Sequence, residues 1–568
     1  QEISFASIIE IVEEQNNGRP EYTSSFTLRF PQLISYQVRK LRSVFDRSIA
    51  ELEYKGKFRA VYPIKVNQRR DVVLQVLLTD PKYGLEAGTK AELVLIKSVL
   101  AEEKHRPIIC NGAKDPEYLQ YIKNCIDESY NIGISIESLH EAHLIANSLD
   151  PEKTNLVFRM KPYLKVRGHW SHSAGRDSKF GLSVHDVFDV VKLLKEKGFQ
   201  KAVTTILGHV GSQITAIEDF KPFAKFMTRV YLELKDWGLN NLDTIDFGGG
   251  LAIDYTSAQP ENMMELYAQA IISGIQDELD EKKSKDSPNI MVESGRGLTA
   301  LASMVLVKAL ELRSVFPQSE SIPEGDQWVS KIRAAHSVSE LVEIWNEFQS
   351  QRQSLADSLE ELKDTECVIG ILREEIRRQI ARLGKEQIRS DTVVESFWHP
   401  DHIVIGNFSV FNSACDYVLV KQHFPIIPIR DLHVKPESTI RLVDITCDSD
   451  GEISQFHRKG TGEIWFTRDY RPLTMPIAEM GQGIPVGYLK NIEGSYFAIA
   501  LTGAYQDVIE MNHNLLGDLP DVEVVLDNEN KWQVRWVTGA EPIEDLLEQM
   551  GYIGFDVDED PYMSGNKE

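Results

Sequence analysis

The chain has 568 residues, and 62 Lys and Arg against 86 Asp and Glu give it a formal net charge of −24. Its 42% hydrophobic and 26% charged residues are typical of a globular protein, and the length leaves room for about three or four domains. Because proteins that bind nucleic acids or anionic membranes concentrate Lys and Arg to neutralise phosphates, the acidic balance argues against both partners.

The cellular compartment is also predictable from the sequence. No run of about 18 apolar residues occurs, so no transmembrane helix is predicted, and the first residues lack the pattern of a signal peptide. The cysteines are scattered and form no CxxC pair, which is typical of free thiols rather than of a disulfide framework or a zinc site. We therefore expect a cytoplasmic protein. The five thiols are Cys110, Cys125, Cys367, Cys415 and Cys447.

Residues 1–57 contain a strand-like run followed by a helical pattern and precede a regular alternation of strands and helices over residues 58–300. Alternation predicts parallel strands joined by helices, and eight such units have the size of a (β/α)8 barrel, with an open doubly wound sheet as the alternative. We favour the barrel because unusual residues cluster where the strands end. The eight runs are FRAVYPIKV, YGLEAG, PIICNG, NIGISIES, NLVFRMKPY, TTILGHVG, TIDFGGG and NIMVESGR.

Two further units are predicted after the barrel. Residues 315–397 have apolar positions at helical spacing, and we expect two or three antiparallel helices inserted for packing or oligomerisation. Residues 301–314 and 398–568 contain short strand-like runs that few helices separate, which predicts an antiparallel β domain. These runs are HIVIGNF, YVLV, FPIIPI, STIRLVDITC, GEIWF, SYFAIALTGAY and VEVVLDN.

The residues at the strand ends indicate chemistry. Lys65 ends the first strand, where burial lowers the pKa of an amine, and a neutral amine can form a Schiff base; the alternative is a salt-bridged lysine. The FGGG run at 247–250 lets backbone N–H groups approach a phosphate, although tight turns also use glycines. Glu293 and Arg296 in ESGR could grip two ends of an anionic heteroaromatic cofactor, or form an ordinary ion pair.

Ten motifs then carry a resemblance that covers nearly the whole chain, in order. They resemble those of the biosynthetic arginine decarboxylases, which belong to the alanine-racemase-like, fold-type III enzymes that use pyridoxal phosphate (PLP). The resemblance implies a PLP-binding barrel followed by a β domain, in agreement with the strand pattern. The motifs are YPIKVNQ, GLEAGTKAEL, SKFGLS, GHVGSQ, DFGGGL, VESGR, NFSVFNS, FPIIPI, TCDSDG and LTGAYQD.

The resemblance also implies roles for single residues. Lys65 would hold PLP covalently, His209 would stack on its ring, and Glu293 would pair with the protonated ring nitrogen. Glu86 would lie near the lysine. The phosphate would be held by Ser212, Gly248, Gly249, Gly250 and Arg296, with Tyr505 adding a contact from the β domain.

Cys447 is the other candidate catalytic residue. By itself a lone cysteine among strands predicts a buried small side chain, and DSDG predicts a β-turn. By resemblance, Cys447 would reach across a dimer interface and protonate the product carbon in the partner's barrel. Asp448 and Asp450 beside it would bind the substrate guanidinium, since carboxylates bind that group bidentately.

The activity implied is decarboxylation of L-arginine to agmatine, the first step of a polyamine route, by a homodimer with shared active sites; pairing into a dimer of dimers stays open. Alternatives are decarboxylation of diaminopimelate, lysine or ornithine, racemisation, or a non-catalytic regulator of the same fold. The sequence has no convincing carboxylate cluster for a metal, and a Mg²⁺ requirement, known for some members, also stays open. The stretch from Arg159 to Trp170 departs from the family pattern, so its contacts are unassigned.

Overall fold

The structure is a computed structural model. It describes residues 3–15, 25–164, 175–256, 259–317, 326–351, 358–383, 396–457, 467–471, 480–527, 529 and 531–552. The predicted strand GEIWF lies outside these residues, as does half of the stretch that departs from the family pattern, residues 165–170. In the described part of the chain, none of the helices is both long and apolar enough to cross a membrane.

Eight parallel strands close into a barrel, which confirms the predicted fold and excludes the open sheet. A small cluster of buried apolar side chains from five of the strands forms its interior core: Val61, Ile109, Val157, Leu207 and Met291. The barrel is therefore packed rather than a pore. The strands are β2 (Phe58–Pro63), β3 (Gly84–Ala87), β4 (Ile108–Cys110), β5 (Ile132–Ile136), β6 (Asn155–Arg159), β7 (Val203–Leu207), β8 (Thr244–Asp246) and β9 (Asn289–Val292).

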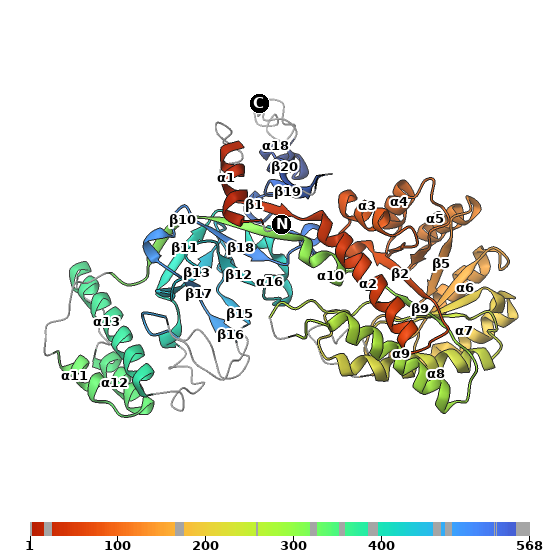
Figure 1. The fold of residues 1–568 in the computed structure, drawn as a ribbon, viewed down its shortest axis with the longest axis horizontal. Coiled ribbons are helices and arrows are strands. Elements are labelled where there is room, and N and C mark those ends of the chain that lie inside the picture. Colours follow the sequence, from red (N-terminus) through yellow and green to blue (C-terminus); the bar gives the residue numbers. More distant parts are fainter. Residues whose placement is uncertain are drawn as a thin grey trace, which may run out of the picture.

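Helices cover the outside of the barrel (Figure 1). Several begin where a polar side chain accepts a hydrogen bond from the first turn: Thr89, Asp115, Ser138 and Ser183. These caps fix where each strand-to-helix loop ends, and the loops carry the site. The helices are α2 (Pro31–Glu51), α3 (Arg70–Thr79), α4 (Lys90–Val99), α5 (Pro116–Asp127), α6 (Leu139–Ser148), α7 (Val184–Glu196), α8 (Phe220–Asp236) and α9 (Met263–Glu281).

A second domain is built on a ten-stranded sheet. We predicted antiparallel strands, and most pairs are, but β1 runs parallel to β19 and β11 parallel to β13. The sheet is therefore mixed, because β1 joins it from before the barrel and because helices lie between β11 and β13. The strands are β1 (Phe26–Arg29), β10 (Ser303–Ser314), β11 (His402–Gly406), β12 (Ile426–Pro428), β13 (Ser438–Val443), β14 (Glu452–Ile453), β17 (Ile484–Val486), β18 (Tyr496–Ala500), β19 (Asp521–Leu526) and β20 (Trp532–Thr538).

One of these helices corrects a strand prediction. The run YVLV belongs to α16 (Cys415–Val420), a short helix that ends at Lys421 in the left-handed conformation. The Gln506 side chain holds its first turn by accepting a hydrogen bond from the Asp416 N–H at 3.0 Å. A run of four apolar residues fits a helix as well as a strand. The contact with Gln506, rather than the local sequence, therefore favours the helix.

Three inserted helices form their own unit: α11 (Gln327–Ala334), α12 (Val338–Gln351) and α13 (Leu359–Leu383). They pack around Trp328, Phe348 and Ile376. Arg377 of α13 and Arg471 both bind Asp401, at 3.1 and 2.6 Å, and tie the insertion to the β domain. The β domain lies between the insertion and the barrel, so the insertion is remote from the barrel strands (Figure 1).

Candidate active site

A cavity of about 510 Å³ opens at the carboxyl ends of the barrel strands, where (β/α)8 enzymes carry their chemistry. The barrel supplies most of its wall. The β domain closes the other side with Asp416, Val420, Tyr505 and Ile509. The cavity is therefore assembled from residues more than 400 positions apart.

Lys65 enters this cavity from a short turn that follows β2. Its Nζ lies 2.7 Å from Glu86 Oε2, and 45% of its side chain is exposed while that of Glu86 is 1% exposed. Burial lowers the pKa of the amine, but Glu86 and Glu293 raise it by more, so the net pKa is raised. The sequence prediction of a neutral lysine is therefore wrong for this structure, because two carboxylates lie near the amine at this position.

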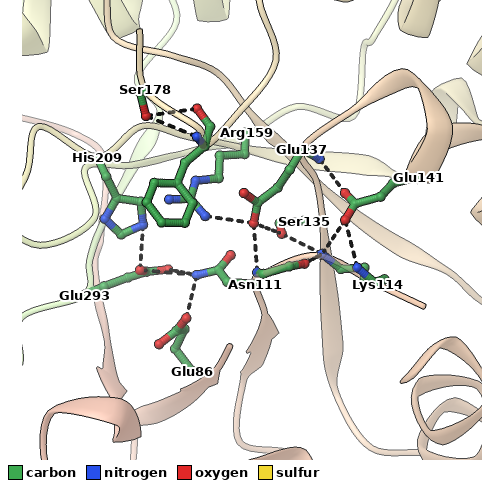
Figure 2. A network of polar contacts seen from close by, with 12 residues as sticks. Glu86, Asn111, Lys114, Ser135, Glu137, Glu141, Arg159, Ser178, His209 and Glu293 are labelled. Atoms are coloured by element: carbon green, nitrogen blue, oxygen red, sulfur yellow. Dashed lines mark hydrogen bonds and ion pairs between the residues drawn. The ribbon is translucent and has the colours of Figure 1, made fainter. Parts of the chain in front are cut away.

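Glu293 follows β9 and is fully buried. Burial raises the pKa of its carboxyl, but the His209 imidazole and the Lys65 amine lower it by more, so the net pKa lies below the usual range. His209 Nε2 is 2.9 Å from Glu293 Oε2, and the Asn111 amide contacts the same carboxylate (Figure 2). Glu293 is thus an anion at the floor of the cavity.

The three glycines that follow β8 do not all face the cavity. Gly249 and Gly250 line the cavity, whereas Gly248 does not. Gly248 has a positive φ of 61°, and a Cβ there would lie 2.3 Å from His209 Nδ1. Its N–H donates to Asp246 Oδ1 at 2.8 Å. Gly248 therefore leaves room for the His209 ring rather than facing the cavity.

Arg296 begins the short helix α10 (Arg296–Thr299) and is a buried cation that lines the cavity. Its Nη1 donates to the Tyr255 hydroxyl at 3.1 Å and its Nε to Ser212 Oγ at 3.4 Å. The Tyr505 ring lies 4.7 Å from the guanidinium, and the Tyr505 N–H donates to the Val66 carbonyl at 2.7 Å. A guanidinium beside hydroxyl groups suits an anion such as a phosphate.

The TCDSDG loop is not part of this cavity. Cys447 is exposed, which excludes a buried small side chain, and its N–H donates to Asn514 Oδ1 at 2.9 Å. Asp448 accepts from the Asp450 N–H at 2.9 Å. None of these three residues is among those lining the cavity of the same chain.

Sequence reasoning missed several lining residues. Asn111 directly follows β4, and Arg159 ends β6 with its Nη1 2.7 Å from Glu137. Both stand at strand ends, so the rule that found Lys65 could have found them. Asp416 lines the cavity from α16, and Tyr255, which contacts Arg296 but is not among the lining residues, lies in a loop. No sequence pattern marks either residue.

Residues 38–300 match the family model described as "Pyridoxal-dependent decarboxylase, pyridoxal binding domain". The biosynthetic arginine decarboxylase of Bacteroides thetaiotaomicron is 30% identical over 561 residues, which are 94% of this chain and 84% of that protein. The enzyme of the same name from Trichlorobacter lovleyi is 30% identical over 557 residues, 93% and 83% of the two chains.

Solved structures agree. The biosynthetic arginine decarboxylase of Campylobacter jejuni superposes with a TM-score of 0.73 at 28% identity, covering 97% of this chain and 88% of that one. Diaminopimelate decarboxylase from Helicobacter pylori, complexed with L-lysine, has a TM-score of 0.61 at 15% identity, covering 95% of this chain and all of that one, and shows the fold alone.

The chain is a PLP-dependent decarboxylase of fold type III. It has the barrel and the mixed-sheet domain of that class, and its cavity contains a lysine, a carboxylate and an arginine. Within that class, the chain belongs to the biosynthetic arginine decarboxylase family.

The cavity residues fit PLP, the cofactor of this family. The Lys65 amine can bind the PLP aldehyde, and the buried Glu293 carboxylate can bind the ring nitrogen. Arg296 can bind the phosphate, and all three residues line one cavity. The Gly249 backbone also leaves the space a side chain would fill, since a Cβ there would lie 3.4 Å from the Glu293 carbonyl. Among the described residues, no three His, Cys, Asp or Glu side chains gather as metal ligands.

Proposed function

We propose that this chain decarboxylates L-arginine to agmatine and CO2, the first step of a polyamine biosynthetic route. The observation that carries the proposal is the joining of Lys65, Glu293 and Arg296 in one cavity, in a chain similar over nearly its whole length to biosynthetic arginine decarboxylases. The reaction breaks the bond between Cα and the carboxylate. The electron pair left on Cα then takes a proton.

PLP, when bound, is the sink for that electron pair. Lys65 binds its aldehyde, Glu293 holds a proton on its ring nitrogen, and His209 covers its ring. The phosphate would be held by Ser212, Gly249, Gly250, Arg296 and Tyr505, which all line the cavity. Gly248 supports this site by making room for His209.

Glu86 prepares the lysine. Because the Lys65 amine is protonated and lies 2.7 Å from Glu86, the carboxylate is placed to take a proton from Nζ. Burial raises the pKa of Glu86, and Glu293 raises it further, although Lys65 lowers it. A carboxylate with a raised pKa is a better proton acceptor, so Glu86 can free the amine for reaction.

Cys447 supplies the proton for Cα, and Asp448 and Asp450 bind the distal guanidinium, from a second copy of the chain. Two observations support a shared site: the Cys447 thiol is exposed, and its loop does not line the cavity of its own chain. A homodimer with two such sites is the proposed assembly. The cytoplasm is the proposed location, where the five free thiols would stay reduced.

The test is CO2 release from L-arginine, L-lysine, L-ornithine and diaminopimelate by the PLP-loaded protein, compared as kcat/KM. Arginine should be the preferred substrate and agmatine the product. A higher kcat/KM for diaminopimelate or another of these acids would replace the substrate assignment. A racemised substrate without CO2 would replace the reaction, and a PLP-loaded protein that turns over none of them would favour a regulator.

A further inference from the structure

Two buried carboxylates meet at the floor of the cavity and share one neutral donor. Asn111 Nδ2 lies 3.0 Å from Glu86 Oε1 and 3.0 Å from Glu293 Oε1 (Figure 2). Each carboxylate has a basic partner on its other side, Lys65 for Glu86 and His209 for Glu293. The Asn111 amide is therefore the group that joins the two acids.

The neutrality of this donor matters. Two carboxylates held close in a low-dielectric interior repel each other, and Glu293 is one cause of the raised pKa of Glu86. A Lys or Arg between them would remove the repulsion but would also neutralise Glu293. An amide binds both oxygens and leaves the charge of Glu293 available for a cationic ring nitrogen.

Asn111 is also held firmly. Its N–H donates to the Ala87 carbonyl at 2.8 Å, directly after β4, and the residue is 3% exposed. Its Oδ1 is buried and has no hydrogen-bond partner among the described residues. An unpaired buried acceptor lowers the stability of the fold. We therefore attribute the presence of an amide at this position to the hydrogen bonds that its Nδ2 donates.

We propose that Asn111 is a positioning residue that fixes Glu293 against the cofactor's ring nitrogen and holds Glu86 beside Lys65 through one shared amide. The inference rests on the proposed roles of Glu293 and Lys65. It adds that their geometry depends on a neutral donor between the acids. Other titratable groups around this position are Arg159, His209 and Asp246.

PLP affinity, measured by absorbance titration of the apo-protein without any substrate, tests this. Asn111→Ala and Asn111→Leu both remove the donor, and each should weaken PLP binding roughly tenfold at pH 6 and at pH 9, the scale of one hydrogen bond to a charged group. Asn111→Asp keeps the shape. At pH 6 a protonated carboxyl can donate to only one of the two acids, so PLP binding should fall severalfold, and it should fall roughly tenfold further by pH 9, where the carboxyl ionises.

The matched control is Asn412→Asp. Asn412 is also buried, and its Nδ2 donates to the Asp518 carboxylate at 2.9 Å, but it does not line this cavity. It should leave PLP affinity within about twofold of wild type at both pH values, the scale of an indirect effect.

If Asn111 only fills space, Asn111→Leu will bind PLP as wild type at both pH values and Asn111→Asp will do so at pH 6, which would overturn the inference. Circular dichroism checks that each variant folds, and Asn111→Asp at pH 6 stays informative if Asn111→Ala does not. Failure of the proposed reaction can be distinguished from failure of this inference. If the wild-type protein binds PLP but leaves arginine unchanged, the reaction is contradicted, while the Asn111 variants would still show the described changes in PLP affinity.

Discussion

Lys65 lies between carboxylates, with Glu86 at 2.7 Å, and its amine is protonated at neutral pH in this structure. Lys65→Ala should remove covalent PLP attachment and lower kcat by several orders of magnitude, because no other lysine among the described residues lines the cavity. Borohydride reduction followed by peptide mass spectrometry checks this, since the cofactor should be found on the peptide containing Lys65. Labelling of another lysine, or retained activity in Lys65→Ala, would contradict the assignment.

The charge of Glu293 leads to a second prediction. Glu293→Gln keeps the shape of the side chain but cannot hold a proton on the ring nitrogen by charge, so PLP should still bind while kcat falls roughly 10²-fold. The measurement is kcat together with the PLP dissociation constant. An unchanged kcat would show that the ring nitrogen does not depend on this carboxylate.

Sequence reasoning identified Lys65, His209, Glu293 and Arg296 because each stands at the end of a barrel strand. It could not give the charge of Lys65, since that depends on the distance to Glu86, which the barrel closure sets. It also missed Asn111, whose type is common in turns and suggests no chemistry until the two acids are seen on either side of it.

Among the elements, the short helix α17 (Gln506–Ile509) leads to Glu510, which lines a second cavity of about 650 Å³ with Asp507 and Asp518. Burial raises the pKa of the Glu510 carboxyl to about 8, and Asp518 and Asp507 add to this effect. In the unfolded chain a glutamate ionises near pH 4. Between these values the folded protein binds the extra proton, so the free energy of unfolding falls as pH rises from roughly 4 to 8.

Glu510→Gln removes this titration. The variant should match wild type near pH 4 and be more stable at pH 8 by roughly 1 kcal/mol, a figure reduced for the partial exposure of the group. Urea unfolding at the two pH values gives the difference. An equal difference at both values would show that packing, rather than ionisation, distinguishes the two side chains.

At the same scale, the elements divide into separate hydrophobic cores for the barrel, the β domain and the insertion. The domain boundaries stay predictions: 1–57 as the N-terminal segment, 58–300 as the barrel, 301–314 with 398–568 as the β domain, and 315–397 as the insertion. The barrel core also contains α2 side chains such as Val38 and Phe45, so part of the N-terminal segment packs with the barrel. The strand error at YVLV came from a run too short to show a period, where one contact from Gln506 decides.

For the whole molecule, the position of Cys447 outside its own cavity predicts complementation between subunits. Cys447→Ala should bind PLP normally but lose turnover, because the proton for Cα is missing. Mixing it with Lys65→Ala should restore activity, since each mixed dimer then carries one site with both wild-type residues. After random exchange the recovered activity should approach about a quarter of wild type.

Separately purified variants that are mixed without subunit exchange provide the control and should stay inactive. Full activity of Cys447→Ala would refute the protonation role. No recovery after exchange, shown by native mass spectrometry to have produced mixed dimers, would refute the shared site.

The overall fold could be predicted because barrel strands and helices alternate locally. The mixed sheet could not, because β1 pairs with β10 and β19, and nothing in residues 26–29 indicates partners hundreds of positions away. The acidic residues of the TCDSDG loop could likewise be identified from the sequence. The distance of this loop from Lys65 of the same chain could not, because it depends on how the whole chain folds.

The hydrogen bond from Tyr505 to Val66 has a consequence for synthesis. The ribosome completes the barrel and its Lys65 long before Tyr505 emerges, and β1 waits even longer for β19. A nascent chain therefore exposes Lys65 in a cavity that lacks the side closed by the β domain. The cavity is therefore complete only after the end of the chain has been made, so a product truncated before Tyr505 lacks one side of the site.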